Sequence, residues 1–508
     1  MMIYGQKTEC WRDLRSIQCT QWHLITAIVV LAHFATLSVS AATGGDAIID
    51  PNTAGQLITG WGYDIKEGGK AAGVTPSYAR MLFVTNIMNC LRIPIYGDAS
   101  DPAHPASGVV IGSYYADTLS AMTNARAANS NVILFASKKL DGQTSFPSWT
   151  ENGNGVIASQ YAAMLADYLQ FMQSNGFTMD ILGVDNERTY NEGNITAATF
   201  GVIITNLASL SASRGFTMPK FLIGPENYAP DTNWLTNLIK NGSGNLLSIV
   251  GTHYYPQNRP VGKLRSLVAS GGSRPDWNSE VHWQNLSSPA DVIDEAQQNI
   301  GAIFDCTDTG LSAYVWWAYG DGGTVQANME QALTVSLTDT RPVYMDDIDG
   351  NSASTPGQLI TRAFASPANL VVWAINDATN VYSDYGFKLL KGAITSAVGY
   401  IQWTANGSTT GTANVTNPSI FRLTLPARTV TMFTVPFNPL VALTIMQSNN
   451  SIIVSWPYPS SGFVLQQNND LNTTNWANAG LIINTNVASN SVTITQPASH
   501  LFFRLISE

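Results

Sequence analysis

The stretch ASQYAAMLADYLQFMQSNGFTMDILGVDNE, residues 158–187, decides the fold of this chain. Its first part, Ala158–Ser174, repeats apolar residues at the three- and four-residue spacing of a helix that buries one face. Its second part, Met179–Glu187, is mostly apolar up to Val184 and then turns polar, which is typical of a buried strand that reaches the surface at its end. A helix followed by a buried strand predicts an α/β fold with parallel strands.

The same alternation of apolar runs and helical patterns extends from about Leu57 to Gly320. Further helical periodicity marks Tyr115–Ala128 and Ala290–Phe304. The predicted strands are Ile58–Asp64, Asn89–Tyr96, Val132–Lys138, Met179–Glu187, Lys220–Asn227, Ser248–Tyr255, Trp277–His282 and Ser312–Ala318. Eight such units in about 260 residues match a closed (β/α)8 TIM barrel. The alternative, an open doubly wound sheet, usually begins with a glycine-rich nucleotide-binding turn, and the sequence has none.

The pattern changes after Asp321. Short alternating runs rich in Val, Thr and Phe, separated by Gly, Asn and Pro, predict an antiparallel β-sandwich over residues 343–437. We therefore expect a catalytic barrel over residues 42–342, with residues 42–56 as a candidate extra strand of the sandwich. A small C-terminal β module over residues 441–508 has predicted strands at Ser451–Trp456, Gly462–Gln467 and Ser491–Gln496.

The N-terminus predicts a secretory signal peptide over residues 1–41. Basic residues precede the mostly apolar run Leu24–Leu37, and the small residues Val39-Ser40-Ala41 form a cleavage site. The alternative is a membrane anchor, but this run is shorter than the roughly 20 apolar residues that a span needs. No later run is long and apolar enough to cross a membrane, so we expect a secreted protein.

Composition excludes several classes of function. The formal charge of −10 and the lack of a Lys/Arg cluster argue against a nucleic-acid partner. No Gly-x-Ser-x-Gly or His-Glu-x-x-His motif is present, which disfavours a serine hydrolase and a zinc peptidase. Cys90 and Cys306 follow the signal peptide without metal-binding spacing; we expect buried thiols, with their pairing left open. The sequence implies neither a cofactor nor a metal.

Polar residues stand where the predicted strands end, and the sites of such barrels lie at those ends. These residues are Arg92, Asn186, Glu187, Glu226, Asn227, His253, Tyr255, Glu280, Trp316 and Trp317. Glu187 and Glu280 end strands four and seven, which face each other across a barrel mouth. Two opposed carboxylates suit glycosidic bond cleavage, because one gives a proton to the leaving oxygen and the other stabilises or attacks the sugar carbon.

Aromatic residues near these strand ends suit the apolar faces of sugar rings. The candidates are Trp149, Trp283, Trp316, Trp317 and Tyr255. Each feature alone has a structural alternative: Asn-Glu after a strand can form a turn, and His253 can be a satisfied core histidine. One of the adjacent tryptophans 316 and 317 is expected in the core, because neighbouring strand residues face opposite ways.

Five motifs in order give the chain a family resemblance. Leu-Arg-Ile at 91–93, Val-Asp-Asn-Glu at 184–187, Gly-Thr-His-Tyr-Tyr at 251–255, Trp-Asn-Ser-Glu-Val at 277–281 and Ala-Tyr-Val-Trp-Trp at 313–317 resemble glycoside hydrolase family 30. The strand-eight motif and the sandwich are most similar to its bacterial xylanase branch. The resemblance covers about Ala47 to Pro436.

The resemblance implies roles for the strand-end residues. Glu187 is the expected general acid/base and Glu280 the expected nucleophile. Asn186 would bind the sugar 2-hydroxyl, while Arg92 and Tyr255 would keep Glu280 ionised and oriented. A retaining mechanism then requires carboxyl groups about 5–5.5 Å apart. His253, Trp149, Trp283 and Trp317 complete the expected substrate-binding set.

The chain also departs from the family pattern. Arg188 stands where many relatives have proline, and the loop after Trp317 lacks the arginine that glucuronoxylan-specific members use for a uronic acid. Lys138 and Lys139 are candidates to contact an anionic glycan instead; the alternative is that they are solvated loop lysines.

We expect a secreted, retaining endo-β-glycanase that acts on a plant or algal polysaccharide, with xylan or another hemicellulose as the first choice. Alternatives on the same scaffold are an exo-β-glucosidase, a β-1,6-glucanase or a galactanase. A non-catalytic carbohydrate-binding protein is an alternative of a different class. The C-terminal module is expected to bind glycan, dock to the cell surface or serve in export, and the sequence does not choose among these.

Overall fold

A computed structural model describes the chain from residue 46 to residue 507. It does not describe residues 68, 140–145, 153–154, 188–194, 258, 284–291, 321–322, 347–358, 367–368, 439–442, 449–450, 458–462, 472, 486–488 and 496–500. The predicted signal peptide, residues 1–41, and Arg188 lie outside the described residues.

Eight parallel strands close into a barrel in the order β10-β11-β2-β3-β4-β7-β8-β9. Their bounds are β2 Gly60–Asp64, β3 Cys90–Ile95, β4 Ile133–Lys138, β7 Ile181–Gly183, β8 Phe221–Asn227, β9 Ile249–His253, β10 Asp276–His282 and β11 Ala313–Ala318. All eight predicted strands are present, so the predicted barrel is confirmed.

The fourth barrel strand is shorter than predicted. We expected Met179–Glu187, but β7 ends at Gly183. The chain leaves the ladder there because the following residues serve the site instead of the sheet, and Glu187 has a left-handed φ of 47°. At the other end, the carboxylate of Asp180 accepts a hydrogen bond from Leu134 N at 2.8 Å, so its side chain fixes the entry to β7.

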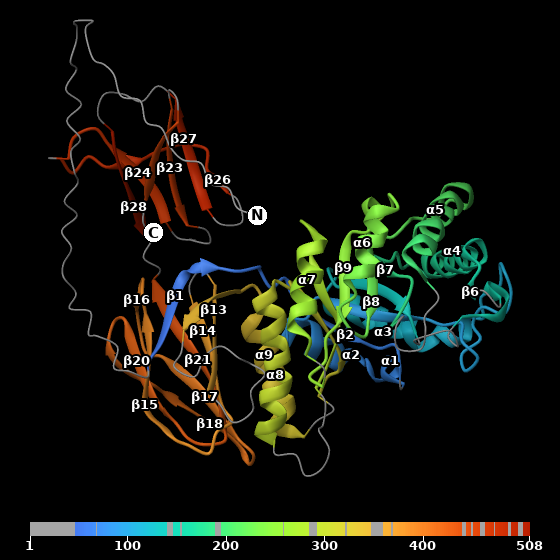
Figure 1. Cartoon of the computed structure of the whole chain (residues 1–508), viewed down its shortest axis with the longest axis horizontal. Coiled ribbons are helices and arrows are strands. Elements are labelled where there is room, and N and C mark those ends of the chain that lie inside the picture. Colours follow the sequence, from blue (N-terminus) through green and yellow to red (C-terminus); the bar gives the residue numbers. More distant parts are fainter. Residues whose placement is uncertain are drawn as a thin grey trace, which may run out of the picture. The chain divides into compact units, whose positions relative to one another are not determined.

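Helices surround the barrel strands, as Figure 1 shows for α3 to α7. The α-helices are α1 Lys70–Gly73, α2 Pro76–Arg80, α3 Ala116–Ala128, α4 Ala158–Ser174, α5 Ala197–Arg214, α6 Thr232–Lys240, α7 Val261–Gly271, α8 Val292–Thr309 and α9 Thr324–Leu337. Short turns of other helix types are η1 Met81–Thr85, η2 Gly112–Tyr115, η4 Ser148–Thr150 and η5 Gly244–Leu246. The predicted helix Ala158–Ser174 is confirmed at both ends.

An apolar layer fills the inside of the barrel. Its buried members come from seven of the strands: Cys90, Phe135, Ile181, Ile223, Ile249, Trp277, Ala313 and Val315. Arg92 stands two residues after Cys90 on β3, so both face the interior. Its guanidinium lies 5.2 Å from the ring centroid of Phe135. The apolar layer therefore lies directly below the charged residues at the strand ends and contacts Arg92 through Phe135.

The sandwich is built from one long hydrogen-bonded sheet. Its strands follow the order β18-β17-β21-β14-β13-β12-β1-β15-β20-β19, and β16 also pairs with β21. The bounds are β1 Ala47–Ala54, β12 Arg341–Asp346, β13 Leu359–Ala365, β14 Asn369–Asn376, β15 Tyr382–Leu389, β16 Ala393–Ile394, β17 Gly399–Thr404, β18 Gly407–Thr412, β19 Asn414–Asn417, β20 Ile420–Leu425 and β21 Thr429–Asn438.

The first described strand belongs to the sandwich although it precedes the barrel in sequence. β1 pairs antiparallel with β12 and parallel with β15, and Figure 1 shows it in blue among orange strands. The sheet is therefore mostly antiparallel, with this one parallel pair. Phe387, Phe421 and Phe433 contact one another in its core, with ring centroids 4.9–5.2 Å apart.

The C-terminal module contains two small sheets, with strand orders β22-β23-β27-β26 and β25-β24-β28. Its strands are β22 Thr444–Ser448, β23 Ser451–Pro457, β24 Phe463–Asn468, β25 Ala477–Asn478, β26 Asn484–Thr485, β27 Ser489–Thr495 and β28 Phe502–Ser507. In the described part of the chain, no helix has the length and apolar character needed to span a bilayer. Cys90 and Cys306 are buried free thiols.

Asp276, at the start of β10, makes stability depend on pH. Burial raises the pKa of its carboxyl to about 7, although Arg274 opposes the shift. The folded state therefore holds a proton that the unfolded state releases near pH 4, so this group's stabilisation is lost as pH rises from 4 to 7. We expect Asp276→Asn to gain stability relative to wild type across that window, by about 4 kcal/mol at most. Urea unfolding at pH 5, 6, 7 and 8 measures this gain, and a constant difference would contradict it.

Candidate active site

Glu280 is held at the end of β10 by three side chains. Arg92 Nη1 donates to Oε2 at 2.5 Å, and Lys66 Nζ donates to the same oxygen at 3.3 Å. Tyr255 Oη donates to Oε1 at 2.5 Å. A bulge in β10 presents the residue: Asn278 pairs with Thr252 and Glu280 with His253, so one residue lies unpaired between them. Glu280 is therefore fixed at both oxygens, one held by two cations and the other by a neutral phenol.

Glu187 faces Glu280 across the barrel mouth. Its Oε1 lies 2.7 Å from His253 Nδ1 and 3.5 Å from Tyr255 Oη. Ligand atoms of Glu187, His253 and Glu280 all lie within 4.8 Å of one another, so a carboxylate oxygen of each glutamate is included in that distance. The two carboxylates that the sequence placed on opposite strands converge on one small space.

Arg92 connects the acids beneath this space. Besides Glu280, its guanidinium donates to Asp64 Oδ2 at 2.8 Å and to Glu226 Oε1 at 2.7 Å. It also donates to Asn186 Oδ1 at 2.8 Å. Arg92 is fully buried, so the chain has placed one cation among three carboxylates out of water. Such a network is stabilising only when every charge has its partner.

Two glutamates at the site adopt a backbone conformation that L-residues rarely use. Glu187 has φ 47° and Glu226 has φ 52°. Such residues cost on the order of 1–3 kcal/mol each and cluster at functional sites. Glu187 N donates to Glu226 O at 2.9 Å, so a backbone hydrogen bond joins these two strained residues. Gly183 allows this arrangement, because a Cβ there would lie 1.8 Å from Glu226 Oε2.

The electrostatics separate the buried acids. Burial raises the pKa of the Glu280 carboxyl, but the neighbouring His253, Lys66 and Arg92 and the hydrogen bond from Tyr255 bring it well below its ordinary value. Burial raises the pKa of Glu226 despite Arg92. Burial also raises the pKa of Tyr255, so the phenol stays a donor. Glu280 is therefore ionised at neutral pH.

A pocket of about 420 Å³ opens above these groups. It is lined by Lys66, Glu67, Asn186, Glu187, Tyr228, Tyr255, Gln257, Glu280, His282 and Trp317. Trp317 lies at its wall, with the His282 ring 4.8 Å from its own and Lys70 Nζ 4.6 Å from its centroid. The pocket thus combines acids with aromatic surface, the combination that suits a sugar ring.

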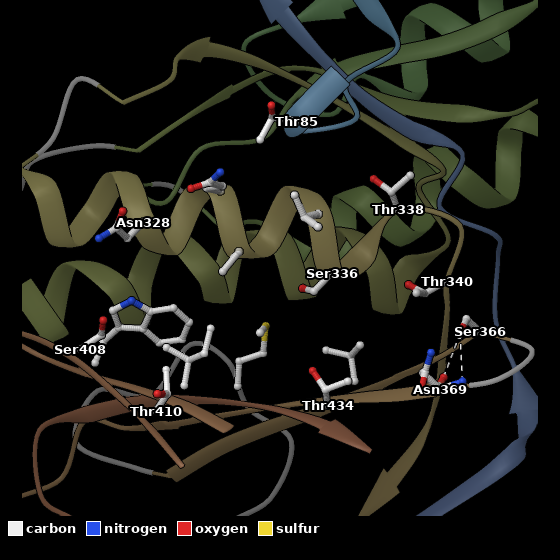
Figure 2. Close-up of a pocket in the computed structure, with 17 residues that line it drawn as sticks. Thr85, Asn328, Ser336, Thr338, Thr340, Ser366, Asn369, Ser408, Thr410 and Thr434 are labelled. Carbon is white, nitrogen blue, oxygen red and sulfur yellow. Dashed lines mark hydrogen bonds between the residues drawn. The ribbon is translucent and has the colours of Figure 1, made fainter. Parts of the chain in front are cut away.

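A larger hollow of about 670 Å³ lies elsewhere, between α9 and the sandwich sheet. Figure 2 shows Asn328 and Ser336 on the helix and Ser408, Thr410 and Thr434 on the strands around it. Among the described residues that line it, none is ionisable. It therefore has no group for acid–base or nucleophilic chemistry, and size alone does not make it the candidate active site.

The structure places the other predicted residues as follows. Trp316 is fully buried and stacks on Trp61 with centroids 5.4 Å apart, so it is the core member of the Trp-Trp pair, as expected. Trp149 donates from Nε1 to His104 O at 2.8 Å, and Trp283 is buried in the large hydrophobic core outside the apolar layer of the barrel interior. Neither lines the pocket, so the structure does not bring these two tryptophans to the acids.

The two strand-three lysines also have partners within the protein. Lys138 is buried, forms an ion pair with Asp185 at 3.0 Å and lies 3.8 Å from the Phe146 ring centroid. Lys139 forms an ion pair with Asp101. The expectation of solvated lysines is wrong for Lys138. Its use against an anionic glycan is also unsupported, because the ammonium is already paired.

Lys66 and Asp64 were not singled out from the sequence, and Glu226 was named only as a strand-end residue. Asp64 ends β2, and Lys66 follows it by two residues. Applying the strand-end rule to the first strand would have found both. Glu226 was recognised as a strand end, but only the fold reveals that it shares Arg92 with Asp64 and Glu280.

The donor set at the site fits a hydrogen-bonded acid pair better than a metal centre. Glu187, His253 and Glu280 are close enough to be joint ligands. However, Arg92 and Lys66 already occupy Oε2 of Glu280. Two cations beside that carboxylate would repel a third, so no cofactor or metal is assigned to these residues.

The chain is similar in sequence to proteins of known function. A search against models of known protein families finds no match. The chain is 26% identical over 286 residues to glucuronoxylanase XynC of Bacillus subtilis strain 168, which covers 54% of this chain and 65% of that protein. A second Bacillus subtilis glucuronoxylanase XynC is 27% identical over 287 residues, with the same coverage. The match thus spans less than two thirds of these relatives.

Solved structures share the fold over a longer part of the chain. A family 30 endoxylanase from Clostridium papyrosolvens C71 gives a TM-score of 0.59 at 19% identity, covering 77% of this chain and all of that one. The catalytic domain of xylanase C from Talaromyces cellulolyticus gives 0.56 at 18% identity, covering 77% and 99%. Sequence similarity and shared fold confirm the resemblance seen in the motifs and identify the chain as a relative of glycoside hydrolase family 30.

Proposed function

We propose that this chain is a secreted, retaining glycoside hydrolase that cleaves β-glycosidic bonds inside a polysaccharide, with xylan as the first-choice substrate. One observation carries the proposal: a carboxylate oxygen of Glu187 and one of Glu280 lie within 4.8 Å of each other, and Glu280 is held ionised. That separation supports a double displacement, which needs carboxyl groups about 5–5.5 Å apart, over inversion, which needs roughly 6.5–9.5 Å.

Glu280 and Glu187 have different roles in the two steps of the reaction. Oε1 of Glu280 attacks the anomeric carbon, because Oε2 is held by the two cations Arg92 and Lys66, whereas Oε1 accepts only from the neutral Tyr255 phenol. The glycosidic bond breaks as Glu187 gives its proton to the leaving oxygen. In the second step Glu187 takes a proton from water, the water oxygen attacks the same carbon, and Glu280 leaves as a carboxylate.

The choice of substrate rests on relatives and on the pocket. Both Bacillus subtilis relatives are named glucuronoxylanases, which favours a xylan. Lys66 and Arg92, the two cations that contact Glu280, already pair with acidic side chains, so neither is left to bind a uronic acid. The proposed substrate is therefore a xylan whose recognition does not require glucuronate. The converging acids also weigh against a purely carbohydrate-binding protein.

A panel of polymers tests the proposal. Purified protein is incubated with glucuronoxylan, arabinoxylan, β-1,4-, β-1,3- and β-1,6-glucans and galactan, and reducing ends are counted. We expect release from both xylans, with a fast drop in viscosity that marks internal cleavage. Proton NMR of the first product should show the β-anomer before mutarotation. An α-anomer would overturn retention, and release from another polymer alone would overturn the xylan assignment.

A further inference from the structure

Lys66 is buried inside the candidate active site, where the proposed mechanism gives it no role beyond its contact with Oε2 of Glu280. It is 2% exposed and lines the pocket. Its Nζ donates to Asn186 Oδ1 at 2.8 Å and to Glu280 Oε2 at 3.3 Å, and it lies 3.9 Å from Asp64 Oδ2. Asp64 Oδ1 also accepts from Lys66 N at 2.7 Å, which fixes the backbone that carries the lysine. Burying a lysine ammonium costs desolvation free energy, so its position among these groups needs an explanation.

We propose that Lys66 is a positioning residue of the double displacement, which fixes the Asn186 amide and stabilises Glu280 as the carboxylate that departs in the second step. This inference rests on the proposed function. The first half follows from hydrogen bonding. Lys66 and Arg92 both donate to Asn186 Oδ1, so the amide NH2 is the part of Asn186 left to donate to a substrate oxygen.

The second half follows from charge. In the glycosyl-enzyme, Glu280 is a neutral ester; when the bond from its oxygen to the anomeric carbon breaks, the electron pair returns to the carboxylate. A cation 3.3 Å from that carboxylate favours this charged product and so assists the second step. In the first step the same cation lowers the nucleophilicity of Glu280. Lys66 should therefore matter more for release of the sugar than for its attachment.

Lys66 does not act on Glu280 alone, and the other groups define the controls. Those facing Glu280 are Arg92 from β3, His253 and Tyr255 from β9 and the segment after it, and Glu187 after β7; Asp64 and Glu226 share Arg92 with it. Removing Lys66 leaves Arg92 on both Asn186 and Glu280. We therefore expect a folded variant with altered chemistry.

The test compares Lys66→Met, Lys66→Gln and Lys66→Arg with wild type on an activated aryl β-xyloside or xylobioside. Met removes both charge and donor, Gln keeps a donor for Asn186, and Arg keeps the charge. We expect kcat of the Met variant to fall roughly tenfold while kcat/KM falls less, with glycosyl-enzyme visible by intact mass. The acid limb of kcat/KM should move up by about one pH unit in Met and Gln and stay in place in Arg. Lys391→Met, at an exposed lysine of the sandwich, should change neither the kinetic constants nor the pH profile.

A second readout does not depend on turnover. Urea unfolding of Lys66→Met, Glu280→Gln and the double variant forms a double-mutant cycle. At pH 7 the two changes in the free energy of unfolding should not add, and this difference should become smaller as pH falls and Glu280 becomes protonated. If this coupling is present in a protein that cleaves no glycan, the proposed function is wrong, but the electrostatic interaction between Lys66 and Glu280 is supported. An active enzyme in which the Met variant shows an unmoved acid limb and equal falls in kcat and kcat/KM would overturn the role of Lys66.

Discussion

Replacing Glu280 by glutamine is expected to lower kcat on the cleaved polysaccharide by at least roughly 10⁴-fold, because an amide cannot form the covalent intermediate. Glu187→Gln should cost roughly 10²–10⁴-fold, since it removes only the proton transfer. The loss in Glu187→Gln should shrink on an aryl glycoside with an acidic leaving group, which departs without protonation. Initial rates on the polymer and on the aryl glycoside measure both effects.

Small nucleophiles separate the two roles. Azide added to Glu187→Ala should restore turnover and give a product of retained configuration, because azide attacks the intermediate held on Glu280. Azide added to Glu280→Ala should give an inverted product, because it attacks the substrate directly from the vacated side. Glu151→Gln, at a half-buried acid of the short strand β5 (Glu151–Asn152) outside the pocket, is the matched control and should keep wild-type rates. Exchanged azide products would mean that the two assignments are reversed.

The fold could be predicted because each barrel strand carries its own local signal. A buried parallel strand is a short apolar run, and all eight runs were visible. The end of β7 was predicted wrongly for the same reason. Val184 continues the apolar run, but the backbone has already left the ladder to place Glu187 beside Glu226. Local hydrophobicity does not record where a chain stops pairing.

The sequence predicted only those residues of the candidate site that lie at the carboxyl ends of the barrel strands. The rule that sites lie at the carboxyl ends of strands named Arg92, Asn186, Glu187 and Glu280, which the structure brings together. Trp149 and Trp283 were predicted from their nearness to strand ends along the sequence, but side-chain direction decides contact. One indole binds the backbone of His104 and the other is buried in the core. Sequence spacing does not give that direction once a strand has ended.

Arg92→Met is expected to destabilise the protein by about 3–5 kcal/mol at pH 8, the usual cost of leaving buried charges without their partner. Arg92 is the shared partner of Asp64, Glu226 and Glu280, which lie almost fully out of water. Methionine keeps most of the volume and the contact with Phe135, so the loss reports charge more than packing. Urea unfolding of wild type and variant gives the difference. Arg126→Met, which breaks the half-exposed pair with Asp180, should cost at most about 1 kcal/mol.

The loss in Arg92→Met should become smaller at low pH. Without the guanidinium, burial raises the carboxyl pKa values in the folded state above those of the unfolded chain, so the folded variant binds more protons and loses stability as pH rises through that window. At pH 5 the acids can protonate and the penalty should fall. Adding Glu226→Gln to Arg92→Met should recover part of the loss at pH 8 by removing one unpaired charge. A loss that is equal at pH 5 and pH 8, and unchanged by Glu226→Gln, would mean that Arg92 stabilises the barrel by packing and not as the shared partner of the acids.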